Sequence, residues 1–233
     1  MSETTQAESP GIGTLSEKSL HAALKQWIAQ PGDQFEVKSG RFVIDIMRGD
    51  TLIEIQTRHL YAMKRKLSRL LPDHTIHLYH PIARQKWIVR QTAEGELVSR
   101  RKSPKKGRLH DIFNELVRIP GLLLEPNLIL HVLLTEEEAI LRDDGQGSWR
   151  RRGWSSHDRL LLDVAEETVL TTAADYLALL PAGLPQPFSN KTLAKALGCQ
   201  TRVAGRMTYT LRAMGLLQLA GKQGQSNLFE VGQ

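Results

Sequence analysis

The chain has 233 residues, of which 41% are hydrophobic and 24% are charged, and its formal net charge is +6. This composition is typical of a folded globular protein that is long enough for two modest domains. No apolar run approaches the roughly 18 residues of a membrane-spanning helix, and the N-terminus lacks the apolar segment of a secretory signal. The chain has one cysteine, Cys199, which excludes an internal disulfide and fits a protein of the reducing cytoplasm. A single thiol also argues against a Cys/His zinc site.

Lysine and arginine residues are concentrated in a few segments of the chain. Residues 99–108 form a basic loop without acidic side chains, and three further arginines lie between Trp149 and Trp154. The cations of these segments that we expect to contact nucleic acid are Lys102, Lys105, Lys106, Arg150, Arg151 and Arg152. Such clusters are typical of phosphate contacts. A solvated surface would explain any one of them alone, and the two tryptophans fit a core equally well.

The first predicted helix covers residues 14–29 and follows a polar lead-in, residues 1–13, that we expect to be disordered. Its apolar side chains recur on one face, at Leu20, Ala23, Leu24 and Trp27. Thr14 and Glu17 fit a capping box at its start, and this role is enough to explain Glu17.

The alternation of residues 35–57 predicts three short strands. On the second strand, Phe42, Ile44 and Ile46 share one face, and Asp45 lies on the other. On the third strand, Ile53 and Ile55 share one face, and Glu54 and Gln56 share the opposite one. We therefore expect Asp45, Glu54 and Gln56 on one face of the hairpin.

Gly49 suits the first central position of a two-residue type II′ turn between these strands. In that turn Arg48 pairs with Thr51, and counting outward puts Asp45 directly opposite Glu54. Cross-strand partners have Cβ atoms roughly 4.5–5.5 Å apart, where two carboxylates repel each other. A bound Mg²⁺ (or Mn²⁺) ion would offset that repulsion.

A second helix is expected over residues 59–71, with a buried stripe of Leu60, Met63, Leu67 and Leu70. A strand over residues 75–79 follows. The nearby histidines His74, His77 and His80 form no ligand motif, and we expect them on the surface. The later elements expected before residue 143 are a helix over residues 109–118, a strand over 128–134, and its continuation over 135–142 into a hairpin turned by the acids at 136–138.

The C-terminal segment predicts three helices and two strands. The helices cover residues 172–180, 190–197 and 201–214, and the strands cover 216–220 and 227–231. This order resembles a winged helix-turn-helix domain. The resemblance implies that Arg202, Arg206 and Tyr209, on the outer face of the third helix, enter the major groove of double-stranded DNA, and that Lys222 in the wing contacts a phosphate.

The N-terminal segment resembles the PD-(D/E)XK nuclease superfamily over residues 14 to about 80, in the order helix, three strands, helix, strand. Asp45 matches the Asp of the motif, and Glu54-Ile55-Gln56 matches Glu-X-Lys with Gln in place of Lys. The resemblance implies an α/β fold with a restriction-endonuclease-like mixed sheet flanked by helices. It also implies a Mg²⁺ or Mn²⁺ site made of Asp45, Glu54 and the carbonyl of Ile55, with Gln56 positioning the water and Glu17 as a possible further acid.

These patterns together predict a nuclease-like domain over residues 14–165 and a winged-helix domain over residues 166–233. The expected function is metal-dependent hydrolysis of phosphodiester bonds in DNA, in the cytoplasm, by a protein that could act as a homodimer or in a larger complex. Two alternatives remain. One is an inactive nuclease-like protein that binds nucleic acid or a partner protein, and the other is a transcription regulator that reads one DNA sequence.

Overall fold

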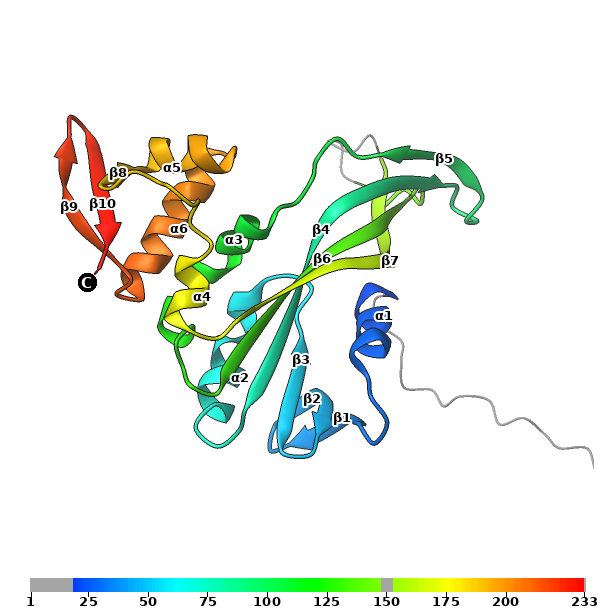
Figure 1. The fold of residues 1–233 in the computed structure, drawn as a ribbon. Helices are drawn as coiled ribbons and strands as arrows, with labels where there is room; N and C mark the ends of the chain where they lie inside the picture. Colours follow the sequence, from blue (N-terminus) through cyan, green and yellow to red (C-terminus); the bar gives the residue numbers. More distant parts are fainter. Residues whose placement is uncertain (1–18, 148–152, 233) are drawn as a thin grey trace, which may run out of the picture.

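The computed structural model describes residues 19–147 and 153–232. Its centre is a mixed sheet with the strand order β1-β2-β3-β4-β6-β7, and β5 pairs with the C-terminal half of β4 (Figure 1). β3, β4 and β6 are parallel to one another, and the other neighbours are antiparallel. The strands are β1 (Gln34–Ser39), β2 (Phe42–Arg48), β3 (Thr51–Ile55), β4 (Ile76–Gln91), β5 (Leu97–Lys102), β6 (Leu128–Arg142) and β7 (Ser155–Leu170).

Helices cover both faces of this sheet. On one face, α1 (Ser19–Ile28) packs against a small core that includes Ile46 and Ile53. The opposite face carries the larger core, which contains side chains of the remaining helices. These are η1 (Leu60–Met63), α2 (Lys64–Leu70), η2 (Leu109–Ile112), α3 (Phe113–Leu116) and η3 (Pro120–Leu122). The protein is therefore a mixed α/β structure with a large sheet flanked by helices, as the sequence predicts.

Residues 173–231 form a smaller unit, which we call the C-terminal module. Its elements are α4 (Ala173–Leu177), β8 (Phe188–Ser189), α5 (Asn190–Leu197), α6 (Thr201–Ala213), β9 (Leu217–Gln223) and β10 (Ser226–Val231). The three strands form a separate sheet in the order β8-β10-β9. The helices and the β9–β10 hairpin occupy the expected segments, and α5 begins and ends at the expected residues.

One hydrophobic core joins the C-terminal module to the large sheet. Leu211 and Phe229 of the module belong to the same buried cluster as Phe113 of α3 and Leu130 of β6. Two arginines add polar contacts across the same boundary. Arg108 donates to the carbonyls of Leu197 and Gly198, at 3.0 and 2.9 Å, and Arg206 donates to Asn114 Oδ1 at 2.6 Å. The position of the module relative to the sheet is thus fixed by packing and by hydrogen bonds.

The rows of buried apolar side chains on the first two helices are close to those expected from the sequence. Leu60, Met63, Leu67 and Leu70 are all buried. The prediction for Trp27 is wrong, since its side chain is 47% exposed and Ile28 is buried in its place. The spacing of four between Leu20, Leu24 and Ile28 keeps these three on one row of the helix, and Trp27 lies beside that row.

The long strand β4 is a departure from the expected strand over residues 75–79, since it continues through Pro81 to Gln91. The carbonyl of Tyr79 accepts a hydrogen bond from the N–H of Gln56, so the backbone polar groups of Tyr79 point toward β3. Pro81 lies two residues later, so its backbone nitrogen faces the same side. The pairing with β3 ends at Tyr79, and the pairing with β5 begins only at Trp87. Pro81 therefore lies where β4 has no neighbour that needs its missing N–H.

The predicted hairpin at the acids 136–138 is wrong, because β6 is one strand from Leu128 to Arg142. Each acid instead pairs with a cation of another strand of the sheet. Glu136 lies 3.0 Å from Arg84, Glu137 lies 2.7 Å from Arg159, and Glu138 lies 2.6 Å from Arg100. These partners remove the need for a solvent-exposed turn.

Strand β7 has no counterpart among the expected elements and runs past residue 165, where we expected the first domain to end. Residues 1–18 and 148–152 lie outside the described residues, and with them the expected lead-in, Thr14, Glu17, Trp149 and Arg150–Arg152. Across the described part of the chain, no helix is both long enough and apolar enough to span a membrane.

We expect the sheet and the C-terminal module to unfold together, because they share one core. Phe113→Ala should lower the free energy of unfolding by about 3–5 kcal/mol, since Phe113 is fully buried where α3 contacts α6. Hydrogen exchange should then rise in β6 and α6 alike, whereas Leu124→Ala, at a 39% exposed position, should change little. Loss of protection in α6 alone would show that the module unfolds independently.

Candidate functional site

The hairpin between β2 and β3 brings the two predicted acids next to each other. Gly49 has a φ of 56°, and the observed pairs are Arg48–Thr51, Met47–Leu52 and Ile46–Ile53. The predicted register is therefore confirmed up to the pair before Asp45 and Glu54. The ladder ends there, and the strands separate at the two acids. On the other side of β2 the ladder is also interrupted opposite Asp45, at Glu36, which has a φ of 53°.

This interruption changes the face of the sheet on which each β2 side chain lies. Ile44 and Ile46, expected on one face, lie in the opposite cores of the sheet. The expectation that Asp45, Glu54 and Gln56 share one face also needs correction. The two acids are adjacent, but His21 of α1 approaches Asp45, and Lys66 of α2 approaches Glu54. The irregular backbone at Asp45 and Glu36 turns the Asp45 side chain toward α1.

Asp45 is held as a carboxylate by groups on both flanks. The backbone N–H of Ile55 donates to Asp45 Oδ2 at 2.8 Å, and His21 Nε2 lies 3.3 Å from the same oxygen. Burial alone would raise the pKa of Asp45, but the hydrogen bonds from His21 and Ile55, with the charges of His21 and Lys66, bring the pKa below its ordinary value. Asp45 thus stays ionised.

Glu54 is in a different electrostatic state. Its side chain is buried, with 3% of the residue exposed, and its partner is Lys66, whose Nζ lies 2.5 Å from Oε1. The backbone N–H of Asp45 also donates to the Glu54 carboxylate. Burial raises the pKa of Glu54 to about 7, and the charge of Asp45 adds to this effect, although Lys66 opposes both. Two neighbouring carboxylates with pKa values on opposite sides of normal are typical of functional sites.

Lys66 is a site residue that the sequence reasoning did not single out. Its ammonium contacts Glu54 and also donates to the carbonyl of Val43 at 2.5 Å, and its side chain is only 14% exposed. A signal was present in the sequence. Lys66 lies three residues after Met63 and four before Leu70, so it stands on the buried stripe of its own helix, where a lysine requires a partner.

Gln56 is not brought to the acids. Its side-chain amide donates to the carbonyl of Arg58, in the loop after β3. The position that carries Lys in the superfamily motif therefore points at its own loop, while Lys66 supplies a cation beside Glu54. No group of three or more His, Cys, Asp or Glu side chains in the described residues is arranged to hold a metal ion. Glu17, the expected further acid, falls in the segment before Ser19 and outside the described residues.

A second polar cluster lies on the α1 face of the sheet. His77 Nδ1 lies 2.8 Å from His131 Nε2, and His131 Nδ1 lies 2.6 Å from Glu167 Oε1. Tyr79 stacks on His131, with ring centroids 4.1 Å apart. The expectation of surface histidines is wrong for His80, which is 6% exposed and bonded to the carbonyl of Gln56. Helices cover the face of β4 on which His80 lies, so its side chain is buried beneath them.

The expected nucleic-acid-binding residues occupy three places. Arg202 and Tyr209 are exposed on α6, and Lys222 is exposed on β9. Lys105 and Lys106 follow β5 in a loop that faces the start of α6, and Lys102 ends β5 itself. The expectation for Arg206 needs correction, because its guanidinium is bonded to Asn114 of α3. It fixes the C-terminal module against the sheet.

Comparisons with known proteins give the family of the chain but no activity. Residues 18–171 match a family described as "Domain of unknown function (DUF8091)". The chain belongs to this family. The matched region ends one residue after β7, so it takes in the whole of the large sheet.

One relative lies in Treponema pallidum (strain Nichols) and is described as "Uncharacterized protein". It is 31% identical over 220 residues, which are 94% of this chain and 86% of the relative. A match of that length includes most of the C-terminal module as well as the sheet. No solved structure matches the chain.

The raised pKa of Glu54 predicts a pH-dependent effect on stability. Between the unfolded pKa of about 4.5 and the folded pKa of about 7, the folded state binds more protons, so stability falls as pH rises across this window. Glu54→Gln cannot ionise. In EDTA, its free energy of unfolding relative to the native chain should therefore increase from pH 5 to pH 8, by at most roughly 3 kcal/mol.

Urea denaturation at the two pH values measures this difference, and other titrations cancel between the two proteins. Glu125→Gln, at an exposed position, is the matched control and should show no such change. An equal difference between Glu54→Gln and the native chain at pH 5 and pH 8 would contradict the raised pKa.

Proposed function

We propose that this protein is a metal-dependent nuclease that hydrolyses phosphodiester bonds and binds double-stranded DNA through its C-terminal module. The observation that carries the proposal is the adjacent acid pair, Asp45 and Glu54, at the point where β2 and β3 separate. Its setting agrees with the PD-(D/E)XK resemblance in the order of elements, from α1 through the three strands to α2 and β4. The clustered positive charge of the chain supports a nucleic-acid substrate.

The donor atoms at the acid pair fit Mg²⁺ or Mn²⁺. Asp45, Glu54 and the carbonyl of Ile55 would hold the ion, and carboxylate and carbonyl oxygens are the ligands that such hard cations prefer. The bound ion would lower the pKa of the attacking water and offset negative charge on the phosphate. Asp45 is already ionised for this role, whereas Glu54 has a pKa near 7 and would release a proton as the cation binds.

Lys66 takes over what the motif lysine does elsewhere in the superfamily. Its ammonium orients Glu54 and adds positive charge beside the acids, where the phosphate would lie. His21 orients Asp45 in the same way from α1. In the reaction, the water oxygen bonds to phosphorus and the bond from phosphorus to the 3′ oxygen breaks. The attacking water gives a proton to solvent, and the leaving 3′ oxygen takes one from solvent to become a hydroxyl.

The C-terminal module supports DNA binding by its order of elements and by its exposed side chains. Three helices followed by a two-stranded hairpin resemble a winged helix-turn-helix domain, in which α6 would enter the major groove and β9–β10 would be the wing. Arg202 and Tyr209 on α6 and Lys222 on β9 remain available for such contacts. Arg206 does not, because it is bonded to Asn114.

A second function is an inactive nuclease-like protein that binds nucleic acid. The observation that favours it is that both acids already have protein partners, His21 and Lys66, and that Gln56 is turned away. A site that never binds a metal needs protein cations to balance its two carboxylates, and His21 and Lys66 lie in position to do so. A metal-binding measurement separates the two functions, since an inactive site would bind neither Mg²⁺ nor Mn²⁺.

We expect the native chain to cleave DNA in Mg²⁺ or Mn²⁺, and Asp45→Asn to lower the rate by about a hundredfold or more, because it loses a ligand charge but keeps an acceptor for the Ile55 N–H. Asp50→Asn, in the exposed turn of the same hairpin, should cleave like the native chain. Gel assays on plasmid, linear and single-stranded DNA measure both. Full activity in Asp45→Asn would refute the site.

Lys66→Met tests whether the cation from α2 takes part. We expect a loss of roughly a hundredfold to a thousandfold in the rate, with DNA binding retained, since one positive group near the developing charge is removed. Lys64→Met, two residues earlier and exposed, is the control and should leave the rate unchanged. Equal rates for the two variants would assign Lys66 a structural role only.

A further inference from the structure

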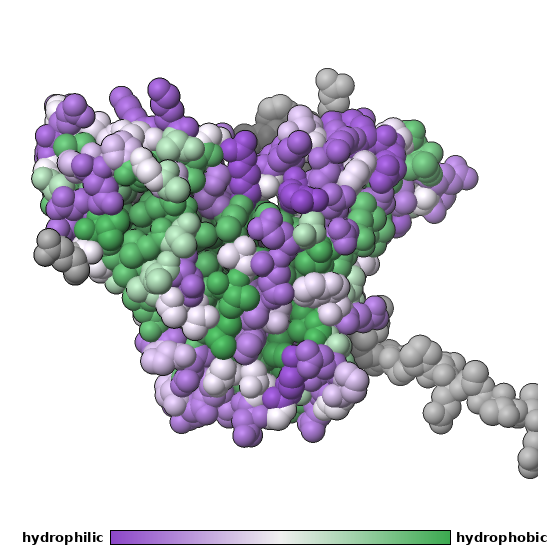
Figure 2. Space-filling model, viewed as in Figure 1, coloured by the Kyte–Doolittle hydropathy of each residue, from purple (hydrophilic) through white to green (hydrophobic). Residues whose placement is uncertain are grey.

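A basic groove lies between the large sheet and the C-terminal module. It consists of adjoining cavities of about 540, 560 and 220 Å³, and each of the residues Lys105, Lys106, Gly107 and Arg108 lines two of them. We call it the junction groove. Figure 2 shows the hollow between the C-terminal module, at the upper left, and the β4–β5 end of the sheet, at the upper right, bordered by hydrophilic residues.

One wall of the junction groove is a loop that is held in place along β4. The backbone N–H of Ser103 donates to Lys86 O at 2.7 Å, and that of Gly107 donates to Ala83 O at 2.9 Å. The backbone at Gly107 lies so close to β4 that an added Cβ would be 2.6 Å from Ile82 Cγ2 and 2.7 Å from Ala83 O. The loop that carries Lys105 and Lys106 is therefore preorganised.

The other wall belongs to the C-terminal module and includes residues 198–200 and Arg202, at the start of α6. Arg108 spans the floor between the walls, since its guanidinium is bonded to the carbonyls of Leu197 and Gly198. Asp111, the acid in this part of the groove, accepts the backbone N–H of Arg108 at 3.0 Å. The spacing of the walls is thus set by the shared core and by these bonds.

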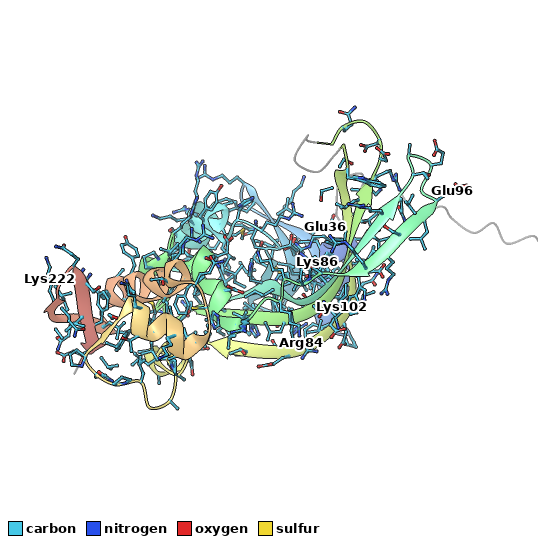
Figure 3. All side chains as sticks on the ribbon, turned by 90° about the horizontal axis from the view of Figure 1, so that it is seen from above. Glu36, Arg84, Lys86, Glu96, Lys102 and Lys222 are labelled. Carbon is cyan, nitrogen blue, oxygen red and sulfur yellow. The ribbon has the colours of Figure 1, made fainter. Side chains whose placement is uncertain are left out.

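The cations on the α6 side of the junction groove lack acidic partners, whereas Arg84, at its sheet end, pairs with Glu136 at 3.0 Å, and Glu166 also lines that end. Lys105, Lys106 and Arg202 are exposed, and none of them forms an ion pair with an acid among the described residues. Arg84, Lys86 and Lys102 lie together on the neighbouring part of the sheet, whereas Lys222 is at the far end of the C-terminal module (Figure 3). Cations without an ion-pair partner in a preorganised groove are suited to phosphate groups.

The sheet end of the groove is linked to the loop that follows β3. Lys86 lines the smallest cavity and lies opposite Glu137 of β6. Glu137 pairs with Arg159, which donates to the carbonyl of Thr57 in that loop at 3.5 Å. Arg58 is four residues beyond Glu54 in the loop that follows β3. A strand that follows the groove from α6 along Lys105 would therefore reach the loop next to the candidate acids.

We propose that the junction groove binds the phosphate backbone of a single nucleic-acid strand that extends from a duplex held by the C-terminal module. Each cavity holds only about 220 to 560 Å³, which is room for the backbone of one strand but not for a double helix. The substrate class is then a duplex with a single-stranded tail. This assignment rests on the proposed function for the fate of the tail, but its binding is measured without metal and without cleavage.

Lys105→Gln/Lys106→Gln tests the groove against Lys64→Gln/Arg65→Gln, which removes the same charge from exposed positions on α2. The probes are a fluorescein-labelled single strand, a blunt duplex and the same duplex with a single-stranded tail, titrated in EDTA. We expect the groove variant to bind the single strand and the tailed duplex roughly tenfold more weakly, and the blunt duplex within about twofold of the native chain. The α2 variant should bind all three probes like the native chain.

The salt dependence gives a second readout. Two lost phosphate contacts to a single strand should reduce the slope of log affinity against log salt by about 1.4. Equal losses in the groove and α2 variants, or an equal loss for the blunt duplex, would overturn the proposal. The nuclease proposal can fail separately. Tail-dependent binding without cleavage in either metal would support the groove and reject the nuclease. Asp45-dependent cleavage, with normal binding by the groove variant, would support the nuclease and reject the groove.

Discussion

The parallel pairing of β4 with β6 is the constraint on which the acid pair and the junction groove both depend. It runs from Ile76–Leu128 to Gln91–Arg142, so β4 is long enough to pair with β3 along its first part and with β5 along its second. The acids lie at the end of β3, and the loop with Lys105 is bonded to the middle of β4. One strand therefore sets the distance and the orientation between the two sites.

The middle of this ladder contains a buried charge that has to be compensated. Glu137 is fully buried and accepts hydrogen bonds from Arg159 and from the Thr135 hydroxyl. Removing one partner of such a pair leaves an uncompensated charge, which typically costs 3–5 kcal/mol. Arg159 also donates to the carbonyl of Thr57, at 3.5 Å. The pair thus connects β7 to the loop after β3, next to the candidate acids.

The sequence predicted the elements whose contacts are local. The β2–β3 register follows from the turn at Gly49, and α5 and α6 follow from apolar periodicity and their closing glycines. The long strands were missed because charged residues and Pro81 interrupt their alternation. Those charges are balanced by partners far along the chain: Glu136 and Arg84 are 52 residues apart, and Glu138 and Arg100 are 38 apart. Periodicity cannot show such partners, because it describes one segment at a time.

The candidate site differs from the PD-(D/E)XK motif that it resembles in where its cation comes from. Reading Glu54-Ile55-Gln56 along the strand leaves the site without a cation, whereas in space Lys66 supplies one from α2 and His21 approaches from α1. The proposed chemistry needs a positive charge near the acids, and several positions on neighbouring elements can place it there. Arg206 shows the converse, since its position in the sequence suggests a DNA contact but its guanidinium joins α6 to Asn114. The function of a charged residue in this fold is therefore set by which element packs beside it.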